Sequence, residues 1–269
     1  MTMQAMPQLG FGTYGRTGEA GIEAISCALQ TGYRHLDTAQ DYDTEAEVGA
    51  ALRAAGLPRE DVFVTTKVRP ANFAPGALVP SLEKSCETLG LGHVDLALIH
   101  WPAPNGERPL SDYIPQLVEA KERGLTRHIG VSNFTIALLD ETLAMLDGVP
   151  LLTNQVELNP WFRNRKLADH CTSRGVTVTC YQPIAKGRLG SDPVMKEIAD
   201  AHDATPEQIA LAFEMSRGYA AIPTSGKAER IRSNFGALDI RLTEGDINRI
   251  EGLDRGQRAI DPDWGPDWD

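Results

Sequence analysis

The stretch that decides the fold is YRHLDTAQDYDTE, residues 33–45. It begins as a short strand in which alternate residues, among them Asp37, share one face. It continues as a loop and ends at Glu45, where an amphipathic helix opens. A carboxylate at the end of a strand and a tyrosine five positions later contribute little to packing. They suit a site in which Tyr42 reaches into a pocket while Asp37 is held still beneath it.

The same strand–loop–helix unit recurs about eight times along the chain. The expected strands cover 7–13, 33–37, 62–67, 94–100, 128–131, 152–156, 176–181 and 219–222. The expected helices cover 18–30, 45–55, 77–89, 110–123, 135–146, 164–174, 192–202, 206–216, 228–236 and 244–253. The strands are almost continuously apolar, as in a parallel sheet that is covered on both faces.

No linker-like stretch divides the 269 residues, so we expect a single α/β domain over 1–269, a (β/α)8 TIM barrel. A doubly wound sheet is the alternative fold, but no GxGxxG follows the first strand. The tail, 255–269, is acidic and rich in turns. The tail could be flexible, but Trp264 and Trp268 favour a tail that folds over the barrel mouth.

Composition excludes several classes of protein. The net charge of −11 disfavours a nucleic-acid or anionic-membrane partner. No apolar run is long enough to span a bilayer, and MTMQAMPQLG lacks the features of a signal peptide, so a cytoplasmic protein is expected. The four cysteines form no CxxC pair and the six histidines are scattered, so we expect no metal site.

Hydrogen-bonding side chains follow seven of the expected strands. They are Asp37, Lys67, His100 with Trp101, Ser132 with Asn133, Gln155 with Glu157 and Asn159, Tyr181 with Gln182, and Thr224 with Ser225. Each has an ordinary structural explanation when taken alone; Ser132 and Asn133, for example, could cap the next helix. In a barrel, however, these strand ends converge on the face that carries active sites.

The chemistry of this set points to proton donation to a developing alkoxide. Tyr42 is a weak acid with an unperturbed pKa of about 10, and we expect the Lys67 ammonium to lower that value. Asp37 would hold Lys67 in place, and His100 would hydrogen-bond a substrate oxygen. No side chain supplies hydride, so a nicotinamide cofactor is implied. The amides of Asn133 and Gln155 would suit its carboxamide, and Tyr181 its ring.

With these residues the chain resembles the aldo-keto reductases. The matching segments are LGFGTY (9–14), HLDTAQDYDTE (35–45), VTTKV (64–68), DLALIHWP (95–102), IGVSNF (129–134), NQVELNP (154–160), YQPIA (181–185) and IPTSGKAERIRSN (222–234). The resemblance implies a (β/α)8 barrel, a tetrad of Asp37, Tyr42, Lys67 and His100, and reduction of an aldehyde or ketone by NADPH. It also implies a monomer.

The resemblance further implies a cofactor site. Its expected residues are Gly12, Thr13, Ser132, Asn133, Gln155, Tyr181, Gln182, Pro183, Ile184, Thr224, Ser225, Lys227, Arg230 and Asn234. The family often has lysine, which binds the 2′-phosphate of NADPH, where this chain has Thr224. Because Arg230 can clamp a phosphate with two parallel hydrogen bonds and Lys227 is close by, NADPH is still expected over NADH.

Expected walls of the substrate pocket are Tyr14, Arg69, Phe73 and Trp101. Arg69 stands where many relatives have tryptophan; it could attract a substrate carboxylate or be a solvated arginine at the rim. Phe73 could instead pack its own loop. Within the family the chain is most similar to bacterial 2,5-diketo-D-gluconate reductases of the B type, which lack the N-terminal hairpin. Such enzymes reduce small dicarbonyls such as methylglyoxal as well as keto-sugar acids.

Two rival functions remain. A nicotinamide-binding sensor on the same barrel would bind NADPH with slow or vestigial turnover, and it would not need all four tetrad groups. A metal-dependent hydrolase or isomerase would need clustered ligands, and only His100, Asp37 and Glu157 are available for them.

Overall fold

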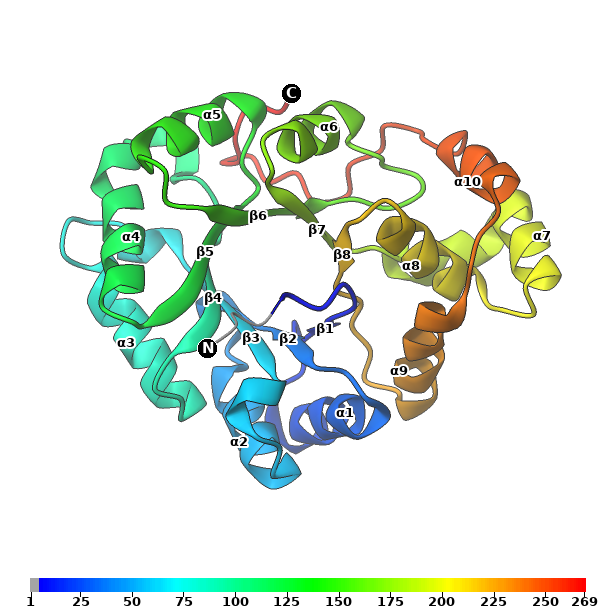
Figure 1. The fold of residues 1–269 in the computed structure, drawn as a ribbon, viewed down its shortest axis with the longest axis horizontal. Coiled ribbons are helices and arrows are strands. Elements are labelled where there is room, and N and C mark those ends of the chain that lie inside the picture. The colour runs from blue at the N-terminus through cyan, green and yellow to red at the C-terminus, as the bar shows by residue number, and fades with distance from the viewer. Residues whose placement is uncertain (1–4) are drawn as a thin grey trace.

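Eight parallel strands form a ring at the centre of the computed structural model, which describes residues 5–269 (Figure 1). They are β1 (Phe11–Gly12), β2 (His35–Asp37), β3 (Phe63–Val68), β4 (Val94–Ile99), β5 (Thr126–Ser132), β6 (Leu151–Glu157), β7 (Thr177–Tyr181) and β8 (Ala220–Ala221). Strands that follow one another in sequence pair in the order β1 to β8. Leu9 bridges Ala221 in parallel, and the Gly10 N–H donates to the Ala221 carbonyl at 2.9 Å, which joins the two ends of the sheet. The predicted (β/α)8 barrel is confirmed, and the doubly wound alternative is wrong.

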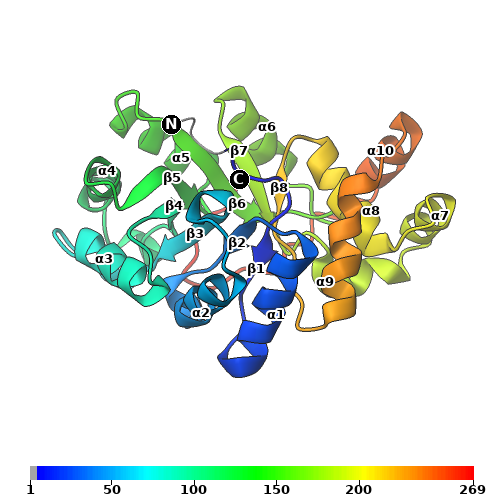
Figure 2. The same ribbon diagram turned by 60° about the horizontal axis from the view of Figure 1, so that its bottom comes forward.

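Helices surround this ring on all sides, as Figures 1 and 2 show. They are α1 (Gly18–Thr31), α2 (Glu45–Ala55), α3 (Leu78–Leu89), α4 (Ile114–Glu122), α5 (Ile136–Met145), α6 (Arg165–Ser173), α7 (Pro193–Ala201), α8 (Pro206–Ser216), α9 (Ala228–Phe235) and α10 (Glu244–Glu251). The expected helix over 110–123 is wrong at its start, because Leu110–Asp112 is a separate 3-10 turn. Pro115 lies in the first turn of α4, where its missing N–H costs no helical hydrogen bond.

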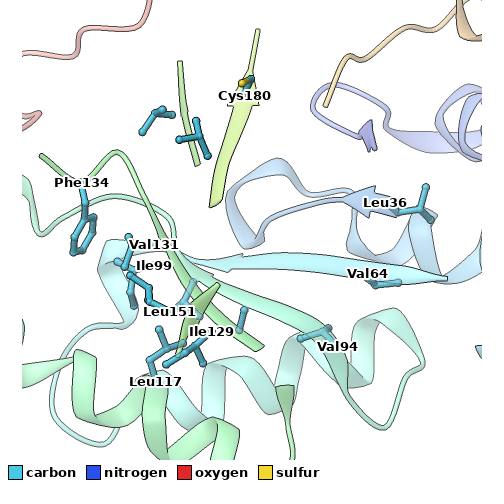
Figure 3. Packing of buried hydrophobic residues seen from close by; sticks show 14 of the residues in the cluster. Leu36, Val64, Val94, Ile99, Leu117, Ile129, Val131, Phe134, Leu151 and Cys180 are labelled. Carbon is cyan, nitrogen blue, oxygen red and sulfur yellow. The ribbon is translucent and has the colours of Figure 1, made fainter. Parts of the chain in front are cut away.

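Alternation along β3 separates the packing face from the functional face. Val64 and Val68 point to the surrounding helices and are fully buried in the main core, whereas Lys67 points into the barrel. Figure 3 shows the same outer layer farther round the ring, where Ile129 lies beside Leu117 of α4 and Ile99 lies beside Val131. Because these apolar side chains pack outside the ring, the inward-facing positions and the C-terminal ends of the strands remain available for polar side chains.

Helix α5 begins differently from the expectation. Its N-cap is Thr135, whose hydroxyl accepts from the Leu138 N–H at 3.4 Å. Asn133 is wrong as a cap, because its backbone is left-handed (φ 63°) and its side chain bonds elsewhere. The Asn133 amide therefore does not cap α5 and lies among the C-terminal ends of the strands.

The missing N-terminal hairpin was predicted partly from residues 1–4, which lie outside the described residues. From residue 5 to Gly10 the chain forms no strand beyond the single bridge at Leu9. No helix within the described part of the chain is both long and apolar enough to cross a membrane.

Candidate active site

The centre of the site is a buried lysine at the end of β3. The Lys67 ammonium has three N–H donors, and it contacts three oxygens. They are Asp37 Oδ1 at 2.5 Å, the Thr38 carbonyl at 2.9 Å and Tyr42 Oη at 3.4 Å. Both members of the Lys67–Asp37 pair are almost completely buried. The ammonium is therefore held in one position, directly beside the Tyr42 phenol.

Tyr42 lies on a short loop that hydrogen bonds hold in place on both sides. It ends the 3-10 turn η1 (Gln40–Tyr42), and Asp43 reverses the chain in a left-handed conformation. On one side the buried Thr44 hydroxyl lies 2.9 Å from those of Thr13 and Thr38. On the other side Gln40 donates to Ser85 Oγ at 3.0 Å and accepts from the Arg69 N–H at 3.0 Å. A loop tied at both ends orders the phenol before any ligand binds.

Electrostatics in this cluster keep the phenol protonated. Burial raises the pKa of Tyr42 above its usual value, and Lys67 offsets this only in part. Lys67 lowers the Tyr42 pKa as expected, but the expected net lowering is wrong, because desolvation outweighs the ammonium. For Lys67, burial lowers the pKa, but Asp37 and Tyr42 outweigh it and raise the pKa above its usual value. A neutral phenol beside a charged ammonium can release its proton and then be stabilised as phenolate.

His100 follows β4 and faces Tyr42, with the two ring centroids 5.4 Å apart. Its Nδ1 lies 3.2 Å from Asp41 Oδ2. Burial lowers the pKa of His100, while the bond to Asp41 opposes that change. With Asp37, Tyr42 and Lys67, the structure thus gathers all four residues of the predicted tetrad.

A second group of polar side chains continues from the tetrad across the strand ends. Gln155 Nε2 donates to Asp37 Oδ2 at 2.8 Å. Asn133 Nδ2 donates to the His100 carbonyl and to Ser132 Oγ, each at 3.1 Å. Tyr181 Oη donates to Asn133 Oδ1 at 2.9 Å, which links β7 to β5. These predicted cofactor residues form one connected network with the tetrad.

Gln182, directly after Tyr181, is held in an uncommon state. Its backbone is left-handed (φ 51°), and its buried Oε1 has no hydrogen-bond partner among the described residues. Strained backbone and orphaned buried oxygens concentrate at ligand sites. The next two residues, Pro183 and Ile184, are buried and half-buried.

The segment after β8 lies against β1. A Cβ at Gly12 would stand 3.1 Å from the Ile222 carbonyl, so glycine permits this close approach. Ser225 Oγ accepts from the Lys227 N–H at 3.1 Å just before α9. Other predicted residues of the segment are Thr224, Lys227 and Arg230, which are exposed, and Asn234, which is buried.

Three of the four predicted pocket residues lie at the rim of the site. Tyr14 is 67% exposed and its ring centroid lies 5.2 Å from that of Tyr42. The half-buried Trp101 adjoins His100, and Arg69 Nη1 lies 3.7 Å from Asp41 Oδ1. Phe73 is wrong as a pocket wall: it is fully buried and stacked on Tyr113 at 4.3 Å, so it packs its own loop.

The C-terminal tail runs past β6 and α6 toward α5, in red in Figure 1. Glu157, at the end of β6, accepts from the N–H groups of Ala259 (3.0 Å) and Ile260 (2.8 Å). The ring of Trp264 then meets Trp101, with centroids 5.0 Å apart, and Trp268 meets it at 6.1 Å. Tryptophans of the tail thus contact a residue that adjoins the tetrad.

Sequence reasoning did not identify Asp41 or Gln40 as site residues, although both lie in the stretch 33–45. The signal available was a second carboxylate directly beside Tyr42. Arg16 was also not identified; a Cβ at Gly226 would collide with its Nη1, so its guanidinium lies against the segment after β8.

Comparisons with known proteins agree with this geometry. The model of the aldo/keto reductase family matches residues 8–255. The methylglyoxal reductase DkgB of Escherichia coli is 41% identical over 98% of this chain and 100% of its own length. That of Yersinia pestis is 42% identical over the same shares.

Solved structures give the same result. A protein described as a 2,5-diketo-D-gluconic acid reductase B is 36% identical, with a TM-score of 0.94, over 98% of this chain and 94% of that one. The aldose reductase of Giardia lamblia is 32% identical, with a TM-score of 0.87, over 94% and 93%. The chain is therefore an oxidoreductase that belongs to the aldo/keto reductase family.

Proposed function

We propose that the protein reduces small aldehydes and ketones to alcohols, with hydride from NADPH and the proton from Tyr42. The observation that carries this proposal is the Tyr42 phenol 3.4 Å from Lys67 Nζ, with Lys67 itself bound to Asp37. A protonated phenol beside a fixed ammonium suits general-acid catalysis on a carbonyl oxygen. A sensor would not need this arrangement.

Each residue has a defined part in the proton transfer. Tyr42 Oη gives its proton to the carbonyl oxygen as that oxygen gains negative charge. Lys67 stabilises the phenolate left behind, and Asp37 holds Lys67 in place. His100 hydrogen-bonds the same carbonyl oxygen and orients it toward Tyr42.

Several features of the chain support a nicotinamide cofactor. The orphaned Gln182 Oε1 offers an acceptor beside Tyr181, and Gly12 permits the close approach of the segment after β8. Exposed Lys227 and Arg230 at the start of α9 could hold a phosphate, which favours NADPH over NADH. When bound, the nicotinamide supplies hydride to the carbonyl carbon.

We propose methylglyoxal and keto-sugar acids as substrates, because relatives over 40% identical are named methylglyoxal reductases and a solved neighbour is named for a diketo acid. Tyr14, Trp101 and Arg69 would wall the pocket. The tail, anchored by Glu157, would cover the barrel mouth through Trp264.

We also infer that the protein acts as a cytoplasmic monomer. Among residues 5–269, three large apolar side chains are exposed, Tyr14, Leu238 and Trp264, and two of these belong to the proposed pocket. An interface between copies would need a wider apolar patch. Sedimentation equilibrium would test this, and a stable dimer would contradict it.

The test of the proposed function is Tyr42→Phe, which removes only the phenol oxygen. We expect NADPH oxidation with methylglyoxal to fall by about 100-fold or more, while NADPH binding, followed by tryptophan fluorescence, changes little. Tyr219→Phe is the matched control, since it makes the same change on a ring that precedes β8 and lies outside the site. If Tyr42→Phe kept most of its turnover, another group would be the acid. A wild-type protein that bound NADPH but reduced no carbonyl would be a sensor.

A further inference from the structure

A carboxylate of the Tyr42 loop contacts the catalytic histidine. Asp41 Oδ2 lies 3.2 Å from His100 Nδ1, and this is the one hydrogen bond of the His100 ring among residues 5–269. The His100 ring is 10% exposed, whereas the Asp41 side chain is 41% exposed. A half-exposed carboxylate therefore holds an almost buried imidazole.

The charge state of Asp41 determines which nitrogen of His100 carries a hydrogen. The hydrogen bond from His100 lowers the pKa of Asp41, and Arg69, with Nη1 at 3.7 Å, also lowers it. At neutral pH Asp41 is therefore ionised and can only accept. Its partner Nδ1 must carry the hydrogen, so a neutral His100 has a bare Nε2.

A bare Nε2 cannot donate to a carbonyl oxygen, whereas the imidazolium can. Reduction therefore favours the protonated ring, and the reverse reaction, oxidation of an alcohol, favours the neutral ring. An adjacent carboxylate stabilises the imidazolium and fixes ring orientation, as second partners of functional histidines generally do.

The other groups that face His100 have opposite effects on its pKa. Lys67 from β3 lowers the pKa of the ring, Asp37 from β2 raises it, and Tyr42 faces it as a neutral phenol. Burial, the largest effect, lowers the pKa. Asp41 is the carboxylate in direct contact with His100, so removing its charge should change the pKa of His100 more than any other single substitution.

We propose that Asp41 is a positioning residue for carbonyl reduction, which keeps the hydrogen of neutral His100 on Nδ1 and favours the imidazolium whose Nε2–H donates to the carbonyl oxygen. This proposal rests on the proposed function for its kinetic consequence. Its structural part, the tautomer and proton affinity of His100, can be measured without turnover.

The kinetic test is the pH dependence of kcat/KM for methylglyoxal reduction in Asp41→Asn. Through its oxygen a carboxamide of the same size still accepts from the Nδ1 hydrogen, but it removes the charge that stabilises the imidazolium. We expect the fall in activity at rising pH to move to lower pH, with about a tenfold loss at neutral pH. Activity should recover toward the wild-type value at low pH. A loss of equal size at every pH would indicate a merely structural role and overturn the proposal.

Asp43→Asn is the matched control. It removes the same charge from the same exposed loop, and asparagine tolerates the left-handed backbone at that position (φ 52°). Its pH profile should match that of the wild type. An equal shift in Asp43→Asn would mean that loop charge in general acts on the site, which would also overturn the assignment to Asp41.

The second measurement is NMR of histidine-labelled protein, with the His100 signals assigned by their loss in His100→Gln. Long-range proton–nitrogen correlations should place the hydrogen of neutral His100 on Nδ1 in the wild type, with a lower pKa in Asp41→Asn. A hydrogen on Nε2, or the same pKa in both proteins, would overturn the proposal. If the wild type reduced no carbonyl, the proposed function would fail, while this titration would still decide the role of Asp41.

Discussion

Replacing Lys67 by methionine should destabilise the whole barrel as well as stop catalysis. Methionine keeps most of the length of the side chain but removes all three hydrogen bonds of the ammonium. Asp37, 1% exposed, would then keep a buried charge with Gln155 as its remaining side-chain partner. Removing one member of a buried ion pair costs about 3–5 kcal/mol. For a chain of this length, that corresponds to a fall in Tm of about 5–9 °C.

The assay is thermal unfolding of Lys67→Met, Asp37→Asn and the double variant, with urea unfolding as a check. The double variant removes both charges, so it should recover most of the stability lost in Lys67→Met. The matched control is Lys84→Met, because Lys84 makes an exposed pair with Glu87 that should contribute little. If Lys67→Met melted within about 1 °C of the wild type, the buried charge would not be unpaired as inferred.

Three further predictions concern single side chains. Arg230→Ala should weaken NADPH binding by about tenfold or more through loss of charge-assisted hydrogen bonds, with little effect on NADH binding. Titration with both cofactors measures this, and Arg232→Ala, at an exposed arginine of the same helix, is the control. Equal weakening of NADPH and NADH binding would contradict the phosphate role of Arg230. If Arg69 recognises a substrate carboxylate, Arg69→Gln should raise KM for a keto-sugar acid by about tenfold and leave KM for methylglyoxal unchanged; the same change for both would place Arg69 outside carboxylate recognition. Burial raises the pKa of Glu214 to about 7, above its usual 4.5, although the buried ion pair with Arg163 opposes this change. Its contribution to stability is therefore present below pH 4.5 and lost as the pH rises through about 7. Glu214→Gln should therefore show a smaller change in unfolding free energy between pH 5 and pH 8, and an unchanged pH slope would refute this.

Features that depend on periodicity and strand ends were predictable from the sequence. Alternation in the strand that ends at Asp37, together with the apolar strands, predicted the barrel, and the barrel brought Asp37 and His100 to one face. The bounds of α2 and α8 were predicted to the residue, because Gly56 ends one and Thr205 and Pro206 begin the other. These signals are local, so a single sequence carries them.

Features that depend on distant contacts were not predictable. Phe73 looks like a pocket aromatic until Tyr113, forty residues later, covers it. The pKa of Tyr42 depends on how much protein surrounds it, whereas the sequence indicated only the neighbouring Lys67. Asp41 became informative only when the fold placed His100 beside it. In each case the deciding partner lies on another element.

The hydrogen bond from Gln155 to Asp37 joins residues that are 118 positions apart, from strands on different sides of the ring. Asp37 is bound by Lys67 of β3 and by Gln155 of β6. Its set of side-chain partners is therefore complete only after six of the eight strands have assembled. A nascent chain that has folded only its first four strands would carry every tetrad residue without the ordered acid beneath Lys67. The order of the site therefore depends on the arrival of β6, and the four strands that carry the tetrad do not complete it by themselves.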